Sequence, residues 1–409
     1  MRWIVFGEDW GRHPSSTQHL FKQIIPQDEV VWVNSMGLRF PQLNSHDLQR
    51  AKEKLSAMLK QASHQKGTHN DELQPLLQPQ HLIQPNTIPL FKSSKVRQFN
   101  CHQLRKQLVR LPKAETSPTV LWISLPSAVD MVGLCNEDFS IYYCGDDFSS
   151  LAGVDHDVIS KMEAELVERC DLILAASPAL AEKFPVGKTR LLEHGVDYDL
   201  FSQPRTKPYH FSERPVIGFY GQLADWVDIE LLGKIADQYP EYDLMIIGAV
   251  NCSTQISTGD LLSKSNVHWI SALPHHQLAA YCQHWQVALL PFKDCPQIQH
   301  CNPLKLREYL ASGTEVLSTA YPAAVAYQGL VHLSPDYQHS SFLNSLNTVL
   351  EQQALQSTLA QQQRKQQRQQ AVINQSWTQK AIEVRQHVLQ ATGAAGSISA
   401  PLNTLHYMG

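Results

Sequence analysis

Short apolar segments alternate with helical patterns along two stretches of the chain, and this alternation limits the fold more than any other feature. The first series of predicted strands covers residues 2–6, 30–34, 120–124, 141–143 and 172–176. The second series covers residues 216–220, 244–247, 267–270 and 287–290. Strands that alternate with helices form parallel sheets, because each crossover is long enough to contain a helix. The expected fold class is α/β, with a parallel sheet in each half.

Length and composition predict two domains. The chain has 409 residues, of which 43% are hydrophobic, and a single core stops growing near ~250 to 300 residues. Residues 202–215 carry three prolines, as an interdomain linker does. We therefore expect one domain over 1–203, with a polar surface insertion at about 47–85, and a second over 204–376. A closing amphipathic helix is expected within 377–393, and residues 394–409 should form a flexible tail.

Charge and cysteine content exclude some classes of protein. A net charge of -4 argues against a nucleic-acid binder, and no apolar run approaches the ~18 to 20 residues of a membrane span. The eight cysteines show no C-x-x-C pair and read as reduced thiols. Cys295, His300 and Cys301 lie close in sequence, but a fourth zinc ligand is lacking. We expect a cytoplasmic protein with no cofactor and no metal.

A basic segment at residues 90–113 has seven basic residues and no acidic one, with leucines at helical spacing. Such a helix can lie on an anionic membrane surface, which here would be peripheral contact with the cytoplasmic (inner) membrane. The alternative is a solvated helix face that covers a core.

Residues 302–313 carry the strongest functional signal. Pro303 occupies a first-turn position, Lys305 and Glu308 lie three apart on one helix face, and Gly313 ends the helix. A helix N-terminus attracts phosphate, Lys305 adds positive charge, and Glu308 can accept hydrogen bonds from vicinal hydroxyls. A nucleotide sugar offers both groups. The alternative is an ordinary amphipathic helix that leads into a buried strand.

Three segments carry a family resemblance, in the expected order. "NPLKLREYLASGTEVLST" at 302–319 resembles the donor-binding helix of retaining glycosyltransferases with the GT-B fold, of the family 4 or group 1 type. "HGVDYDLF" at 194–201 is similar to the segment that precedes their interdomain linker. "IGFYGQLADWVDIELL" at 217–232 resembles the first strand and donor loop of their second domain. "GEDWGRHPSSTQHL" at 7–20 and "YYCGDDFSSL" at 142–151 are similar to a bacterial branch that builds surface polysaccharides.

This resemblance implies two doubly wound Rossmann-type domains that face each other across a cleft, with the closing helix returning to the first domain. It implies a hexosyltransferase that moves a sugar from a nucleotide-sugar donor to a saccharide or lipid-linked saccharide acceptor in polysaccharide biosynthesis, with retention. The donor phosphate itself then takes the acceptor proton, and no pair of carboxylates is required. Nucleic acid is not an expected partner.

The resemblance also implies roles for individual residues. Glu308 would hold the ribose, Lys305 the diphosphate, and His300 would approach the transferred sugar; these three are the expected catalytic residues. The expected donor-binding residues are Gly221, Gln222, Gly248, Asn302, Pro303, Leu304, Lys305 and Glu308. The expected acceptor-side residues are Gly7, Trp10, His13, Ser15, Asp146 and Asp147.

Two departures from the family pattern leave other functions open. The loop 222–226 has no cation where many relatives carry Arg and Lys, and His300 replaces a family Glu. The diphosphate charge then falls to Lys305, to helix N-termini, and to Arg307 or Lys293. One alternative is a non-catalytic sugar-nucleotide-binding partner of an active transferase. Another is a GT-B sugar-nucleotide epimerase, which would need paired carboxylates that the motif regions do not show.

Overall fold

The computed structural model describes residues 1–12, 15–36, 77–88, 90–109, 111, 117–151, 154–208, 213–250 and 255–393. His13, most of the predicted insertion, and the predicted tail lie outside these residues.

The first domain is built on a seven-stranded parallel sheet with the order β3-β2-β1-β4-β5-β6-β7. Its strands are β1 (Arg2–Phe6), β2 (Glu29–Val33), β3 (His81–Ile83), β4 (Thr119–Ile123), β5 (Phe139–Cys144), β6 (Leu172–Ala175) and β7 (Thr189–Leu191). The strand order reverses between β1 and β4, so the sheet is doubly wound. Strand β3 corrects the prediction of a surface insertion over 47–85, because residues 81–83 pair with β2 at the sheet edge.

The helices of the first domain follow its strands. They are α1 (Ser16–Ile24), α3 (Ser94–Val109), η1 (Pro126–Met131), α4 (His156–Arg169), α5 (Pro178–Ala181) and η2 (Val186–Lys188). Helix α1 begins where the Ser15 hydroxyl accepts a hydrogen bond from the Gln18 amide. The loop between β1 and α1 therefore opens at the carboxyl edge of the sheet, beside the reversal of strand order.

The second domain repeats this plan with six parallel strands in the order β10-β9-β8-β11-β12-β13. They are β8 (Val216–Tyr220), β9 (Asp243–Ile247), β10 (Val267–Ile270), β11 (Val287–Leu290), β12 (Glu315–Ser318) and β13 (His332–Leu333). The order reverses between β8 and β11. In sheets of this kind ligands bind outside the carboxyl ends of the strands at the reversal, so this point marks the candidate donor site.

The remaining helices surround the second sheet and then cross the molecule. They are α6 (Tyr198–Ser202), α7 (Ile229–Gln238), α8 (Gln255–Leu262), α9 (His275–Cys282), α10 (Pro296–His300), α11 (Leu304–Ser312), α12 (Pro322–Val325), α13 (His339–Leu355), α14 (Thr358–Val372), η4 (Ile373–Gln375) and α15 (Trp377–Thr392). Helix α13 ends at Leu355, and Ser357 caps a new helix by accepting a hydrogen bond from the Ala360 amide.

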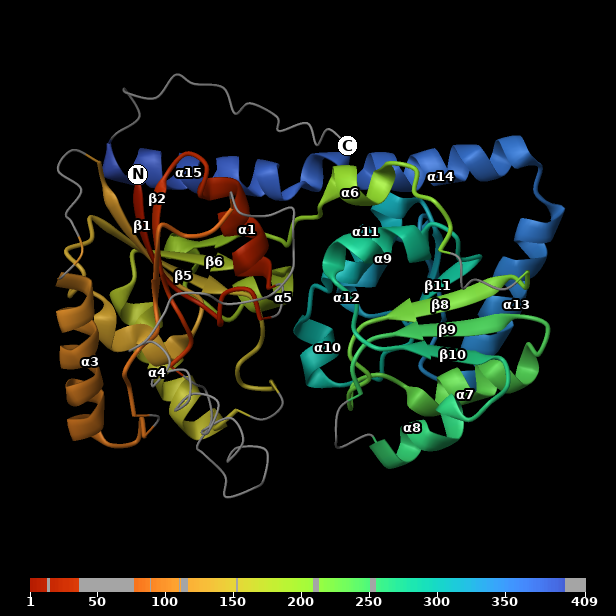
Figure 1. Cartoon of the computed structure of the whole chain (residues 1–409), viewed down its shortest axis with the longest axis horizontal. Helices are drawn as coiled ribbons and strands as arrows, with labels where there is room; N and C mark the ends of the chain where they lie inside the picture. Colours follow the sequence, from red (N-terminus) through yellow and green to blue (C-terminus); the bar gives the residue numbers. More distant parts are fainter. Residues whose placement is uncertain are drawn as a thin grey trace.

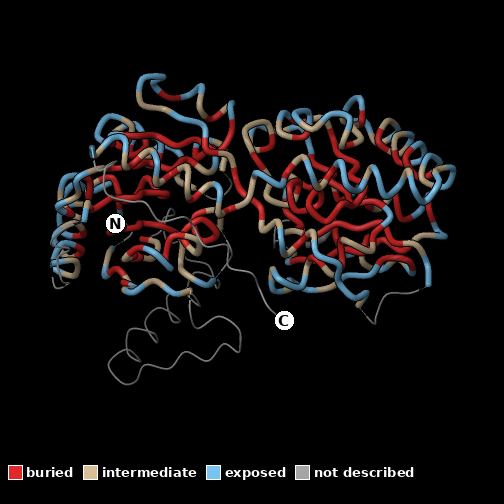
Figure 2. The backbone as a smooth tube through the Cα atoms, turned by 90° about the horizontal axis from the view of Figure 1, so that it is seen from above, coloured by how far each residue is buried: buried red, intermediate tan, exposed pale blue. Residues whose placement is uncertain are grey.

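Each sheet has its own hydrophobic core, and Figure 2 shows the buried segments gathered in two lobes. The apolar face of α15, including Trp377 and Val384, belongs to the first core. Helices α14 and α15 therefore run across both lobes along one side of the molecule (Figure 1). Val196 and Phe201 already pack in the second core, so the chain enters that core before the predicted boundary at 204.

None of the helices in the described part of the chain combines the length and the apolarity that spanning a membrane requires.

Candidate functional site

Two glycines shape the carboxyl edge of the second sheet. Gly221 follows β8 with φ 140°, and Gly248 follows β9 with φ 154°. A side chain on Gly248 would overlap the carbonyl of Gly221, and a side chain on Gly221 would overlap the ammonium of Lys305. The absence of a Cβ at both positions lets the two loops and the lysine approach one another. Lys305 thus lies at the reversal of strand order.

Lys305 extends from the first turn of α11 between two aromatic rings. Its Nζ is 4.8 Å from the ring centroid of Phe219 and 5.5 Å from that of Phe292. Burial lowers the pKa of Lys305 to about 8, although the charges of Glu308 and Cys301 act in the opposite direction. An ammonium held in this way gains from an incoming anion, because it has lost much of its hydration.

Glu308 lies one turn further along α11 and is buried. Its Oε1 accepts a hydrogen bond from His275 Nε2 at 2.6 Å, and its Oε2 accepts one from the Tyr220 hydroxyl. Burial alone would raise the pKa of Glu308, but the charge and hydrogen bond of His275 and the hydrogen bond of Tyr220 lower it below the usual value. The group is an ionised acceptor, and two of its roughly four acceptor positions are used.

Asn302 and Arg307 bind protein groups in this structure, so the donor contact of Asn302 and the diphosphate contact of Arg307 stay predictions. Asn302 is buried, donates to the carbonyl of Ala176 at 2.6 Å and accepts a hydrogen bond from Arg307. Arg307 is also buried and donates to Glu193 at 3.0 Å and to Gln375 at 2.6 Å. Both residues hold the two domains together.

Pro303, Leu304, Gln222 and Lys293 flank the site without a polar contact that fixes their role. Pro303 is the N-cap residue of α11, and Leu304 packs against the first core. The side chains of Gln222 and Lys293 are exposed. Their donor contacts stay predictions.

His300 reaches the first domain. Its Nδ1 lies 3.1 Å from Asp147 Oδ2 and 2.8 Å from the carbonyl of Pro296. Asp147 is buried, accepts a hydrogen bond from the Ser149 hydroxyl at 2.6 Å, and pairs with Lys183. Burial alone would raise the pKa of Asp147, but these partners lower it to about 2. Asp147 is thus held by protein groups, and its acceptor contact stays a prediction. His300 has only Nε2 left for a sugar.

The loop after β1 places a carboxylate that the sequence analysis missed. Gly7 and Trp10 both pack on Trp32. A Cβ on Gly7 would lie 2.6 Å from an atom of the Trp32 ring, and the ring centroids of Trp10 and Trp32 are 4.7 Å apart. Glu8 lies between them and accepts a hydrogen bond from the Ser15 hydroxyl at 2.9 Å. Burial raises the pKa of Glu8. Its place directly after β1, beside the reversal of strand order, is the signal that could have found it.

Asp146 follows β5 at the same edge of the first sheet. Asp146 is an exposed residue. Desolvation by the protein, together with the charges of Glu8 and Asp147, raises the pKa of Asp146. Cys301 of the second domain is close enough to feel the charges of both Asp146 and Lys305, although burial is the main cause of its raised pKa. Asp146 of the first domain thus lies on the same side of the interface as Cys301 and Lys305 of the second.

One group of side chains in the described ranges has a geometry that suits a metal. His19, Asp197 and His275 each offer a ligand atom within 4.8 Å of the others. The contacts of these residues are also explained as hydrogen bonds and ion pairs. The described side chains of Cys295, His300 and Cys301 do not form such a group.

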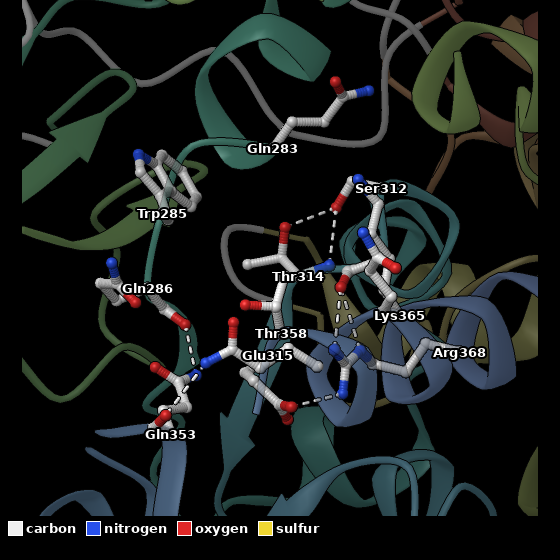
Figure 3. A pocket seen from close by; sticks show the side chains of 13 residues that line it. Gln283, Trp285, Gln286, Ser312, Thr314, Glu315, Gln353, Thr358, Lys365 and Arg368 are labelled. Atoms are coloured by element: carbon white, nitrogen blue, oxygen red, sulfur yellow. Dashed lines mark hydrogen bonds and ion pairs between the residues drawn. The ribbon is translucent and has the colours of Figure 1, made fainter. Parts of the chain in front are cut away.

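A cavity of about 260 Å3 lies away from this edge (Figure 3). Its lining includes Gln286 and Glu315, at the amino ends of β11 and β12, and Arg368 of α14. Arg368 pairs with Glu315 at 2.6 Å and donates to the carbonyl of Gly313. Parallel strands bind ligands at their carboxyl ends, so we do not assign the donor to this cavity.

Known proteins resemble this chain in fold. The solved structure of sucrose-phosphate synthase from Thermosynechococcus elongatus has a TM-score of 0.68 and 15% identity, and it covers 96% of this chain and 99% of the other. The structure of Anabaena Alr3699/HepE in complex with UDP and glucose has a TM-score of 0.65 and 11% identity, and the match covers 94% of this chain and 98% of the other. The fold is GT-B. This confirms the expected fold class of two doubly wound domains.

Sequence comparison supplies one relative. A putative teichuronic acid biosynthesis glycosyltransferase, TuaH of Bacillus subtilis (strain 168), is 27% identical over 250 residues. The match covers 56% of this chain and 63% of the relative, which is less than two thirds of its length. No family model matches the chain.

Proposed function

We propose that this protein is a hexosyltransferase that moves a sugar from a nucleotide-sugar donor to a saccharide or lipid-linked saccharide acceptor. The observation that carries the proposal is the Lys305 ammonium against the backbone of Gly221, at the point where ligands bind in sheets of this topology. The name of the B. subtilis relative supports a role in polysaccharide biosynthesis. A trehalose-6-phosphate structure from E. coli of the same fold is bound with UDP-2-fluoro glucose, which supports a nucleotide sugar as donor.

In the proposed reaction the bond between the anomeric carbon and the diphosphate breaks, and its electron pair leaves with the diphosphate. Lys305 and the N-terminus of α11 stabilise that developing negative charge. Glu308 accepts hydrogen bonds from the ribose hydroxyls of the donor. The acceptor oxygen bonds to the anomeric carbon with retention, and its proton passes to an oxygen of the leaving phosphate. Asp146 and Glu8 orient the acceptor hydroxyl from the first domain.

Donor binding tests this proposal first. Thermal unfolding in the presence of UDP-, GDP-, ADP- and dTDP-sugars should reveal at least one stabilising donor, because a ligand at 100 times its Kd adds ~2.7 kcal/mol. Nucleoside diphosphate release should then require an added saccharide acceptor. Absence of any shift in the melting temperature across the panel would contradict the proposal.

Two alternatives make different predictions in the same assay. A non-catalytic binding partner would bind a donor but show no acceptor-dependent release. The cation-free loop 222–226 and the commitment of Arg307 to protein contacts favour this candidate. An epimerase would release nucleotide or interconvert donors without an acceptor. It would need paired carboxylates, and the charge of Glu8 helps to raise the pKa of Asp146.

We also infer peripheral contact with an anionic membrane through α3, within the basic segment 90–113. Arg97 does not contribute, because it pairs with Asp130 at 2.7 Å and with Glu165 at 2.5 Å. The exposed side chains of α3 instead form a mixed basic and apolar stripe at one-turn spacing. The stripe consists of Lys95, Phe99, His102, Lys106 and Val109.

Vesicle binding tests this contact. Replacing Lys95 and Lys106 with Gln should weaken binding to phosphatidylglycerol vesicles by roughly 30-fold at low salt, since each lysine near an anionic surface contributes about 1 kcal/mol. Co-sedimentation measures the change. Lys161→Gln, at an exposed position of α4, is the matched control and should leave binding unchanged. The contact would be contradicted if Lys161→Gln weakened vesicle binding as much as the double replacement of Lys95 and Lys106. It would also be contradicted if the unaltered protein bound neutral and phosphatidylglycerol vesicles equally well.

A further inference from the structure

A chain of polar contacts links α1 of the first domain to Glu308 of the second. His19 Nδ1 lies 3.1 Å from Asp197 Oδ2, and the same oxygen lies 3.5 Å from His275 Nδ1. His275 Nε2 donates to Glu308 Oε1 at 2.6 Å. Asp197 belongs to the segment between the two sheets. The chain therefore starts in one domain, passes through the junction, and ends on the proposed ribose ligand of the other.

His275 is the central member because each of its ring nitrogens faces a carboxylate. A neutral imidazole donates from one nitrogen only, whereas an imidazolium donates from both. Burial alone would lower the pKa of His275, but the charge and hydrogen bond of Glu308 and the charge of Asp197 raise it. Burial alone would raise the pKa of Asp197, but His19 and His275 lower it. An imidazolium between two carboxylates satisfies all three groups.

The first domain fixes the other end of the chain. The His19 ring stacks on Trp377 of α15, with centroids 5.5 Å apart and planes at 10°, and meets the His275 ring edge-on at 4.7 Å. His19 is buried. Its contact with Asp197 can exist only while α1, α15 and the junction stay packed together. Separation of the domains would therefore change the contacts of Asp197, which in turn contacts His275.

The same contacts settle the orientation of Glu308. His275 holds one carboxylate oxygen and Tyr220 the other, so the plane of the carboxylate is set by two donors. Removal of the His275 donor would leave a buried oxygen without that partner and the side chain free to rotate. The two ring nitrogens of His275 therefore do separate jobs: Nε2 holds Glu308, and Nδ1 connects it to the first domain.

We propose that His19, Asp197 and His275 are positioning residues that orient Glu308 toward the donor ribose and make this orientation depend on contact between the domains. The inference rests on the proposed function, in which Glu308 binds the ribose hydroxyls. It adds the residues that place Glu308 and a link between the interface and donor affinity.

The test compares nucleoside diphosphates with and without ribose hydroxyls. Calorimetry gives the Kd of UDP, GDP and ADP and of their 2′,3′-dideoxy counterparts. The Kd ratio is the Kd of the dideoxy nucleotide divided by the Kd of the nucleotide with ribose hydroxyls. In the pair that binds most tightly, this ratio reports the ribose contact. Because hydrogen bonds to a charged group are strong, we expect a ratio of about tenfold or more in the unaltered protein and near one in Glu308→Gln.

Two substitutions of one residue separate the two jobs of His275. His275→Asn keeps a donor at the Nδ1 position and removes the one that holds Glu308, so its Kd ratio should fall to that of Glu308→Gln. His275→Gln keeps a donor at the Nε2 position, so its ratio should stay within about threefold of the original. His276→Gln, at the exposed neighbouring position, is the matched control and should change nothing.

His19→Phe tests the link to the first domain. It keeps a ring against Trp377 but removes the donor to Asp197, so the Kd ratio should fall although position 19 lies in the other domain.

The outcomes separate this inference from the function on which it rests. Equal Kd ratios in the unaltered protein, His275→Asn and His19→Phe would overturn the positioning chain alone, while nucleotide binding stands. An affinity loss that is the same for both members of a pair would mark a purely structural role and would also overturn it. Lack of binding of any nucleoside diphosphate by the unaltered protein would remove the proposed function and this inference together.

Discussion

Lys305→Met should lower kcat/KM for sugar transfer by about 10²- to 10³-fold, the loss seen when one preorganised partner of a developing oxyanion is removed. Methionine fills a similar volume between Phe219 and Phe292 but cannot stabilise the leaving diphosphate. Steady-state kinetics with the donor identified by thermal unfolding measures the effect. Folding should be unaffected or slightly improved, because the lowered pKa of Lys305 means that its charge is disfavoured in the folded state.

The pH dependence of the same lysine distinguishes a role in charge from a role in packing. With the pKa of Lys305 at about 8, the ammonium is lost as pH rises, so kcat/KM should fall on the basic side near that pH. Lys305→Arg should retain part of the activity and lose this basic limb, because a guanidinium stays charged to above pH ~12.

Lys234→Met supplies the matched control for both measurements. Lys234 is an exposed lysine on α7 in the same domain that pairs with Glu230, and its replacement should change kcat/KM by less than about twofold. Activity of Lys305→Met within a few-fold of the original would show that the diphosphate lies elsewhere. It would also remove the observation on which the proposed function depends.

The strands were predictable where both faces of a strand are buried. Strands β1, β8 and β11 have the predicted bounds, because strands buried in a parallel sheet read as short apolar runs. Strand β10 also has the predicted bounds, although it lies at a sheet edge and has two exposed residues. Strands β3, β7 and β13 were not predicted. They have three, three and two residues and lie at sheet edges, where exposed or partly exposed side chains such as Arg190 interrupt any apolar pattern.

The site was predictable only as far as local spacing determines it. Lys305 and Glu308 share one face of α11, so their common position follows from the helical repeat. Asn302 and Arg307 stand in the same motif, yet their partners Ala176 and Glu193 come from the first domain, more than a hundred residues earlier in the chain. No pattern within the motif contains that information.

The carboxylates of the first domain show the same limit. Asp146 was predicted from its motif, but its raised pKa results from desolvation and from the charge of Glu8, which lies at the end of a different strand. Likewise His19 and His275 carry no sequence signal that relates them, and only the packing of α1, α9 and α15 brings their rings together. Contacts between the domains are therefore the part of this site that required the structure.

Arg307→Met should cost about 3 kcal/mol of folding free energy, near the lower end of the range for breaking a buried charged network. The substitution leaves Glu193 without its cation and removes a donor from Asn302 and from Gln375, which holds the chain just before α15. The cost stays near the lower end because the side chain of Glu193 is 33% exposed and can be solvated. Urea unfolding monitored by tryptophan fluorescence measures the change.

Arg307→Lys tests whether the charge of Arg307 is sufficient for stability, and Arg205→Met is the control. A lysine keeps the charge but cannot reach Glu193, Asn302 and Gln375 at once with one ammonium, so it should recover little stability. Arg205→Met, at an exposed site in the linker, should change stability by less than about 0.5 kcal/mol. If Arg307→Met instead kept full stability and lost nucleotide affinity, Arg307 would be a diphosphate ligand after all. The interdomain contacts that hold α11 against the first domain would then have to open when the donor binds.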